Sequence, residues 1–178
     1  MNRVMLSAFR EELEKIAEIH LLSGGTGAGK STEARRRAKH YDHVFTTDIG
    51  EVVNGKYTFP PDKKKARAEK EAKILALHRQ GKKILVEGYN NGVSKYPGLV
   101  ANASKMEVMG TSTPVRLFRV LKRHVEQGRK ILDFSRFPPI VPLSDTGWRP
   151  VKEDREALQR IRRINPSLPI TTAKKTKD

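Results

Sequence analysis

The residues best suited to hold phosphate lie in a glycine-rich stretch, Gly24-Gly-Thr-Gly-Ala-Gly-Lys-Ser31. Its spacing is G-x-x-x-x-G-K-[ST], which is typical of a phosphate-binding P-loop. Glycines lack Cβ, so successive backbone N–H groups can turn toward one anion. The lysine of this pattern reaches the terminal phosphates, and its serine hydroxyl holds Mg²⁺. The residues expected to surround a nucleoside triphosphate are Gly25, Thr26, Gly27, Ala28, Gly29, Lys30, Ser31 and Thr32.

The segments on either side of this stretch fit the same interpretation. The apolar run Ile19–Leu22 indicates a buried strand, and a helix is expected to begin at Lys30. The unpaired N–H groups and the dipole of that helix would favour an anion at its start. The alternative is a glycine-rich turn that contains a lysine by chance. The strand before and the helix after favour the P-loop, and hence binding of ATP or a related triphosphate with Mg²⁺.

Two carboxylates are expected at the ends of predicted strands. Asp48 closes the strand 43–48, and Glu87 closes the apolar strand 82–87. Ligands of parallel sheets bind beyond the carboxyl ends of the strands, so both side chains should lie near the P-loop. We assign Asp48 as the general base and, with Ser31, Glu87 as a metal ligand. The alternatives are a turn or helix-capping aspartate, and a surface glutamate paired with a lysine.

A row of arginines follows Thr113-Pro114, which is a typical start of a helix. Arg116, Arg119 and Arg123 recur three and four residues apart, and Arg129 lies just beyond. Such a row before a proline-rich segment suits a basic lid over residues 115–150. Arg123 and Arg129 are its candidate catalytic residues; the alternative is a solvated basic face.

The remaining pattern predicts an α/β fold. Further elements are expected at 4–17 (an amphipathic helix), 63–80 (a basic helix), 105–110 (a strand) and 152–164 (a helix). Alternating strands and helices favour a P-loop NTPase-type three-layer sandwich with a mostly parallel central sheet of four or five strands. We divide the chain into an N-terminal helix (1–18), the P-loop domain (19–164) and a mobile basic tail (165–178).

Composition limits the classes of function. The chain has 178 residues, a net charge of +16 and a pI near 10.2, which together favour polyanionic partners such as nucleic acid. With no cysteine there are no disulfides or thiolate sites, which fits a cytoplasmic protein, in a host cell if a phage encodes it. No apolar run approaches the roughly 20 residues of a membrane helix, and Glu11, Glu12 and Glu14 argue against a signal peptide.

The order of these motifs resembles the P-loop kinases that include bacteriophage 5′-polynucleotide kinase, with zeta-toxin-like kinases and phage hydroxymethyluracil-DNA kinases as relatives. The resemblance covers about residues 19–130. It implies phosphate transfer from ATP, with Asp48 as the base that activates the acceptor hydroxyl and a lid arginine among 119, 123 and 129. The chain departs from that family in two ways. Glu51 stands where the family has an arginine that grips the acceptor's phosphate, and Gly88-Tyr89 separates Glu87 from Asn90.

The leading hypothesis for the acceptor is a hydroxyl of nucleic acid, either a 5′ end or a hydroxymethylated base. The basic residues expected to grip backbone phosphates are Lys63, Lys64, Lys65, Arg67, Lys70, Lys73, Lys82 and Lys83. Tyr57, Tyr89 or Trp148 could stack on a flipped base, although ordinary packing is the commoner role of such residues. The alternative is a kinase of a nucleoside, nucleotide or sugar nucleotide. A third possibility is an ATPase without an acceptor.

Overall fold

The computed structural model describes residues 17–25, 27–53, 56–110 and 151–173. The strands are β1 (Ile19–Gly24), β2 (His43–Thr46), β3 (Glu51–Val53), β4 (Lys56–Thr58), β5 (Ile84–Gly88), β6 (Lys105–Met109) and β7 (Ile170–Ala173). The helices are α2 (Lys30–Arg37), the short 3₁₀ helix η1 (Ala38–His40), α3 (Lys63–Arg79), α4 (Asn90–Val93), α5 (Pro97–Ala101) and α7 (Val151–Ile164). The predicted N-terminal helix, the arginine-bearing helix and the lid lie outside the described residues, except for Ala17 at the end of the first.

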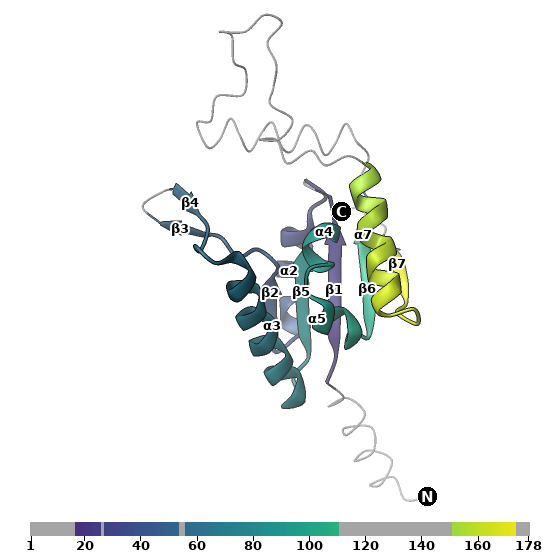
Figure 1. Cartoon of the computed structure of the whole chain (residues 1–178). Helices are drawn as coiled ribbons and strands as arrows, with labels where there is room; N and C mark the ends of the chain where they lie inside the picture. The colour runs from purple at the N-terminus through teal and green to yellow at the C-terminus, as the bar shows by residue number, and fades with distance from the viewer. Residues whose placement is uncertain (1–16, 26, 54–55, 111–150, 174–178) are drawn as a thin grey trace, which may run out of the picture.

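Five strands form the central sheet, in the order β2-β5-β1-β6-β7 (Figure 1). All four of its strand pairs are parallel, as in β1 with β5, where Ile19 is opposite Ile84. Because the strands run in one direction, their carboxyl ends meet at one edge of the sheet. The prediction of an α/β fold with a mostly parallel sheet of up to five strands is therefore confirmed.

The tail beyond residue 165 was predicted wrongly in part. Residues 170–173 form β7, which pairs in parallel with β6 at the edge of the sheet. Met106 donates its N–H to Pro169 O at 2.9 Å, so the pairing begins before the strand itself. The described part of the tail thus belongs to the sheet and is not a mobile extension.

Apolar side chains cover both faces of the sheet. On one face Leu21 and Val86 belong to a large buried cluster that includes Ile74 of α3 and Ile161 of α7. On the other face a smaller cluster joins the sheet to α2, with residues Leu22, Ala28, Ala34, Leu85 and Met109. The alternation along β1 and β5 follows from the two-residue period of a strand. Helices thus cover both faces, which gives the expected three layers.

The segment between β2 and α3 carries an antiparallel hairpin that extends away from the sheet in Figure 1. The strands β3 and β4 flank Asn54-Gly55, a dipeptide typical of hairpin turns, which lies outside the described residues. Asp62 then caps α3 by accepting the backbone N–H groups of Lys64 and Lys65, both at 2.9 Å. Gly81, with φ of 82°, follows the end of α3 as expected.

Two predicted strand ends are shifted in the structure. The strand β2 ends at Thr46, so Asp48 follows it by two residues instead of closing it. Glu87 is followed by one more strand residue, Gly88. The short helix α4 begins at Asn90, three residues after Glu87. Both carboxylates nevertheless remain at the carboxyl edge of the sheet.

Replacing Gly88 by alanine is expected to destabilise the fold by about 1–3 kcal/mol. A Cβ at Gly88 would lie 2.0 Å from Oγ1 of Thr47, which would force the segment carrying Asp48 to move. Urea denaturation would measure the loss. Gly110→Ala is the control, because its Cβ would only approach Cγ2 of Thr172, at 3.3 Å. Equal stability of the Gly88 variant and the wild type would contradict this packing.

None of the helices in the described parts of the chain is long and apolar enough to cross a membrane.

Candidate active site

The P-loop connects β1 to α2 through glycines in backbone conformations that other residues rarely adopt. The φ angles of Gly24, Gly27 and Gly29 are 147°, 74° and 91°. A Cβ on Gly24 would also lie 2.9 Å from the carbonyl oxygen of Met109. These positions therefore require glycine, as a loop that wraps closely around an anion does. Thr26, also predicted to bind nucleotide, lies outside the described residues.

Lys30 begins α2 and is buried beside the loop. Its Nζ donates to the carbonyl oxygen of Gly25 at 2.9 Å and lies 4.3 Å from the ring centroid of Tyr89. The N-cap residue of α2 is Gly29, which has no side chain that could accept hydrogen bonds from the first N–H groups of the helix. The ammonium group and the helix start thus offer positive charge at the same place.

Ser31 and Glu87, the two predicted metal ligands, lie in contact. The Ser31 hydroxyl is 3.1 and 3.0 Å from the two carboxylate oxygens of Glu87. Among the described residues no group of three or more His, Cys, Asp or Glu side chains could hold a metal. Mg²⁺ in phosphate-transfer sites takes few protein ligands and completes its shell with phosphate and water. A hydroxyl beside a carboxylate fits that ion, and the metal role stays a prediction.

Asp48 is exposed and lies on the same rim of the sheet as Lys30. It lines a hollow of about 270 Å³, here called the smaller hollow, whose walls include Asp48, Phe59, Arg67, Tyr89, Lys95 and Tyr96. Tyr89 therefore borders this hollow while its ring also contacts the Lys30 ammonium. The structure thus places one tyrosine beside both Lys30 and the hollow that the predicted base lines. The role of Asp48 as base stays a prediction.

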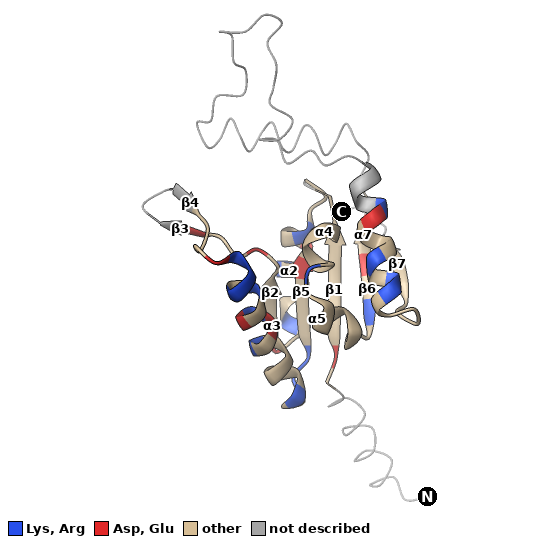
Figure 2. Ribbon diagram, viewed as in Figure 1, with Lys and Arg blue, Asp and Glu red and all other residues tan. Residues whose placement is uncertain are grey.

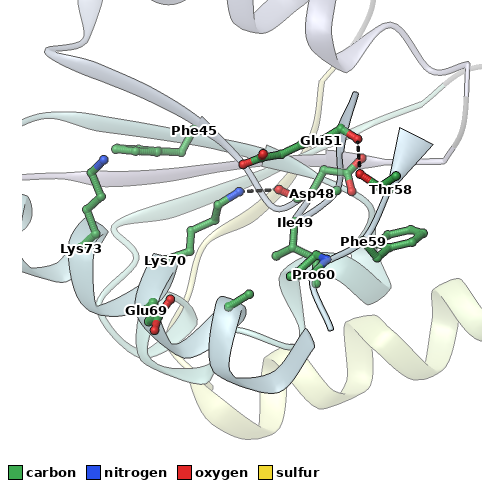
Figure 3. Close-up of a pocket in the computed structure, with 12 residues that line it drawn as sticks. Phe45, Asp48, Ile49, Glu51, Thr58, Phe59, Pro60, Glu69, Lys70 and Lys73 are labelled. Atoms are coloured by element: carbon green, nitrogen blue, oxygen red, sulfur yellow. Dashed lines mark hydrogen bonds between the residues drawn. The ribbon is translucent and has the colours of Figure 1, made fainter. Parts of the chain in front are cut away.

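Two side chains hold the Asp48 segment in place by donating hydrogen bonds to three consecutive backbone carbonyls. Nζ of Lys70 donates to the carbonyl oxygen of Thr46 at 3.2 Å and also to that of Asp48 (Figure 3). The hydroxyl of Tyr96 donates to the carbonyl oxygen of Thr47 at 3.0 Å. Burial lowers the pKa of Lys70 and raises the pKa of Tyr96 to about 12. The two side chains come from different parts of the chain and fix the segment from both sides.

This arrangement changes the assignment of Lys70. The sequence pattern predicts that it grips nucleic acid with the other cations of α3, whereas its ammonium group binds backbone carbonyls of the Asp48 segment. Similarly, Lys63 lies 4.5 Å from the ring centroid of Phe59. Lys64, Lys65 and Lys73 are exposed on α3. Nothing in the sequence separates a lysine that binds carbonyls from one that faces solvent.

Lys70→Met is expected to lower kcat for phosphate transfer by about 10- to 100-fold, because a small displacement of the base is costly. Affinity for Mg·ATP should stay unchanged, since Lys70 contacts the Asp48 segment and not the P-loop. Steady-state kinetics and nucleotide titration measure the two effects. Arg79→Gln, at the exposed end of the same helix, should behave as wild type. Equal losses in kcat and ATP affinity would argue against this role.

A larger hollow of about 480 Å³ adjoins the smaller one. It lies between the segment after β2, the base of the hairpin and α3 (Figure 3). Asp48, Ile49 and Phe59 line both hollows and form the wall between them. The candidate acid-base residue thus borders two adjoining spaces. The predicted lid arginines, Arg123 and Arg129, and Trp148 lie outside the described residues.

Comparisons with known proteins give the following results. The chain matches no protein-family model, and a search of curated proteins finds no match. Shikimate kinase from Acinetobacter baumannii in complex with shikimate is similar in structure, with 14% identity and a TM-score of 0.46 over 94% of this chain and 88% of that one. The kinase domain of the Escherichia coli tyrosine kinase ETK gives 10% identity and a TM-score of 0.45 over 98% and 76%. Both superpositions are loose, so the fold is assigned from the strand order and loop geometry of this chain.

Proposed function

We propose that the protein is a phosphotransferase that moves the γ-phosphate of ATP to a hydroxyl group, with Mg²⁺ as cofactor. The position of Tyr89 between Lys30 and the hollow that Asp48 lines is the observation that supports this most strongly. It implies that a phosphate held by the loop and a hydroxyl beside Asp48 would both lie next to this side chain, close to each other. Phosphate transfer needs this positioning together with neutralised charge.

The residues divide the work as follows. Backbone N–H groups of the loop and the Lys30 ammonium bind the phosphates and stabilise the negative charge that builds up on them. Asp48 accepts the proton of the attacking hydroxyl on its carboxylate as the new O–P bond forms. The bond between the γ-phosphorus and its bridging oxygen breaks, and ADP leaves with the electron pair. Mg²⁺, when bound near Ser31 and Glu87, would neutralise phosphate charge.

Two classes of acceptor have support. Nucleic acid, with a 5′ end or a hydroxymethylated base as the hydroxyl, is supported by the net charge of +16 and by the cations along α3, where Figure 2 also shows acidic residues. A small molecule such as a nucleoside, nucleotide or sugar nucleotide is supported by the hollow beside Asp48, whose volume suits such a ligand. Binding of nucleic acid should weaken steeply with salt, whereas binding of a small neutral acceptor should not.

Incubation with γ-labelled ATP and a panel of hydroxyl acceptors tests the proposal. The panel contains 5′-hydroxyl oligonucleotides, DNA with hydroxymethyluracil, nucleosides and nucleoside monophosphates. Label on one acceptor class would support the phosphotransferase and identify the acceptor. Label that appears in free phosphate alone, with every acceptor, would favour an ATPase and contradict the proposal.

A further inference from the structure

The larger hollow differs in charge from the rest of the molecule. Its lining contains three carboxylates, those of Asp48, Glu51 and Glu69, but only two lysines, Lys70 and Lys73. One of these, Lys70, already donates to the carbonyl oxygens of Thr46 and Asp48. In a chain with a net charge of +16, the space beside the candidate base is therefore acidic. Such a lining disfavours a phosphate and favours groups that donate hydrogen bonds.

The smaller hollow, toward Tyr89, has the opposite balance. Arg67 and Lys95 reach it from α3 and from the connection between α4 and α5, and Asp48 is its lone lining carboxylate. Arg67 forms no ion pair with any carboxylate among the described residues. The same hollow is lined by Tyr89, whose ring contacts the Lys30 ammonium. The transferred phosphate would therefore meet positive charge on that side of Asp48, and the acceptor would lie on the acidic side.

Apolar and aromatic groups complete the larger hollow. Phe45 lines it at β2, and Ile49, Phe59 and Pro60 line it below the hairpin. The Phe59 side chain is 52% exposed, although large apolar side chains are usually covered. A flat ring stacked on an aromatic side chain is a common mode of binding nucleobases. The volume, about 480 Å³, also falls in the range of small-molecule pockets, about 300–1,000 Å³.

We propose that the larger hollow binds the body of the acceptor, and that this acceptor is a nucleoside-sized alcohol with a flat ring, N–H donors and no phosphate beside its hydroxyl. This inference rests on the proposed function. The ring lies against Phe59, and Glu51 and Glu69 accept hydrogen bonds from it. Asp48, in the wall between the two hollows, receives the proton of the hydroxyl. Glu51 repels a phosphate from this side.

Binding to protein saturated with Mg²⁺ and the β,γ-imido analogue of ATP tests this without any turnover. Calorimetric titrations measure the affinities of adenosine, guanosine, cytidine and uridine. Each affinity is compared with that of the corresponding nucleoside 3′-phosphate. At least one nucleoside should bind at least 10-fold more tightly than its 3′-phosphate. Phe59→Ala should weaken the binding of that nucleoside about 10-fold. Glu51→Arg should remove or reverse the preference, whereas Glu156→Arg, at an exposed position of α7, should leave it unchanged.

Three results would overturn the inference. They are tighter binding of the 3′-phosphates to the wild type, no measurable nucleoside binding at millimolar concentration, and unchanged binding in both the Phe59 and Glu51 variants. The proposed function can fail or survive independently of these results. If the protein phosphorylated a 5′-hydroxyl oligonucleotide through Asp48 but bound no nucleoside, the phosphotransferase would stand and this acceptor would be wrong.

Discussion

Asp48→Asn is expected to lower kcat for phosphate transfer by about 10²- to 10⁴-fold while leaving the affinity for Mg·ATP unchanged. The amide has nearly the shape of the carboxylate but cannot take a proton from the acceptor hydroxyl. Asp48 is not part of the P-loop, and its backbone is held by Lys70 whichever side chain is present. Single-turnover transfer and nucleotide titration would measure the two quantities.

Glu156→Gln on α7 is a suitable control, because this exposed carboxylate lies outside both hollows. Combining Asp48→Asn with Lys70→Met adds a second test. If Lys70 acts by positioning Asp48, Lys70→Met should lower kcat little further in a protein that already carries Asp48→Asn. Normal transfer by the Asp48 variant would remove the base from the mechanism, although nucleotide binding could remain.

Lys30→Met should lower kcat/KM for transfer by at least about 10²- to 10³-fold, since it removes a positive charge aimed at the phosphates. Unlike the Asp48 variant, it should also weaken Mg·ATP binding, because in the proposed mechanism the ammonium binds the phosphates in both the ground state and the transition state. Lys39→Met is the control, an exposed lysine in η1. A Lys30 variant with normal ATP affinity and normal transfer would contradict the assignment of the loop.

The P-loop and the parallel sheet could be predicted from sequence because local residues determine them. The glycine spacing, the apolar run before it and the capping residue Asp62 each act within a few positions of the chain. By contrast, β7 was missed. Its residues follow Pro166 and precede a lysine-rich end, and it becomes a strand by pairing with β6, more than 60 residues away.

The contacts that organise the site could not be read from the sequence. Lys70 stands in a basic helix whose other lysines face solvent, so its bonds to Thr46 and Asp48 depend on how α3 packs beside β2. The place of Tyr89 beside both Lys30 and the hollow that Asp48 lines follows from the adjacency of β1, β2 and β5 in the sheet. The positions of Asp48 and Glu87 could be predicted because the strand ends of a parallel sheet share one edge. No comparable rule predicts contacts between side chains that are far apart in the sequence.

A crystal structure of the protein with Mg²⁺ and the β,γ-imido analogue of ATP would show whether the P-loop and Asp48 meet at one transferred phosphate. We expect the γ-phosphate between Lys30 Nζ and the Asp48 carboxylate, with room for one hydroxyl oxygen beside Asp48, and Mg²⁺ near Ser31 and Glu87. A γ-phosphate that points away from Asp48 and from the wall between the two hollows would contradict the proposed mechanism.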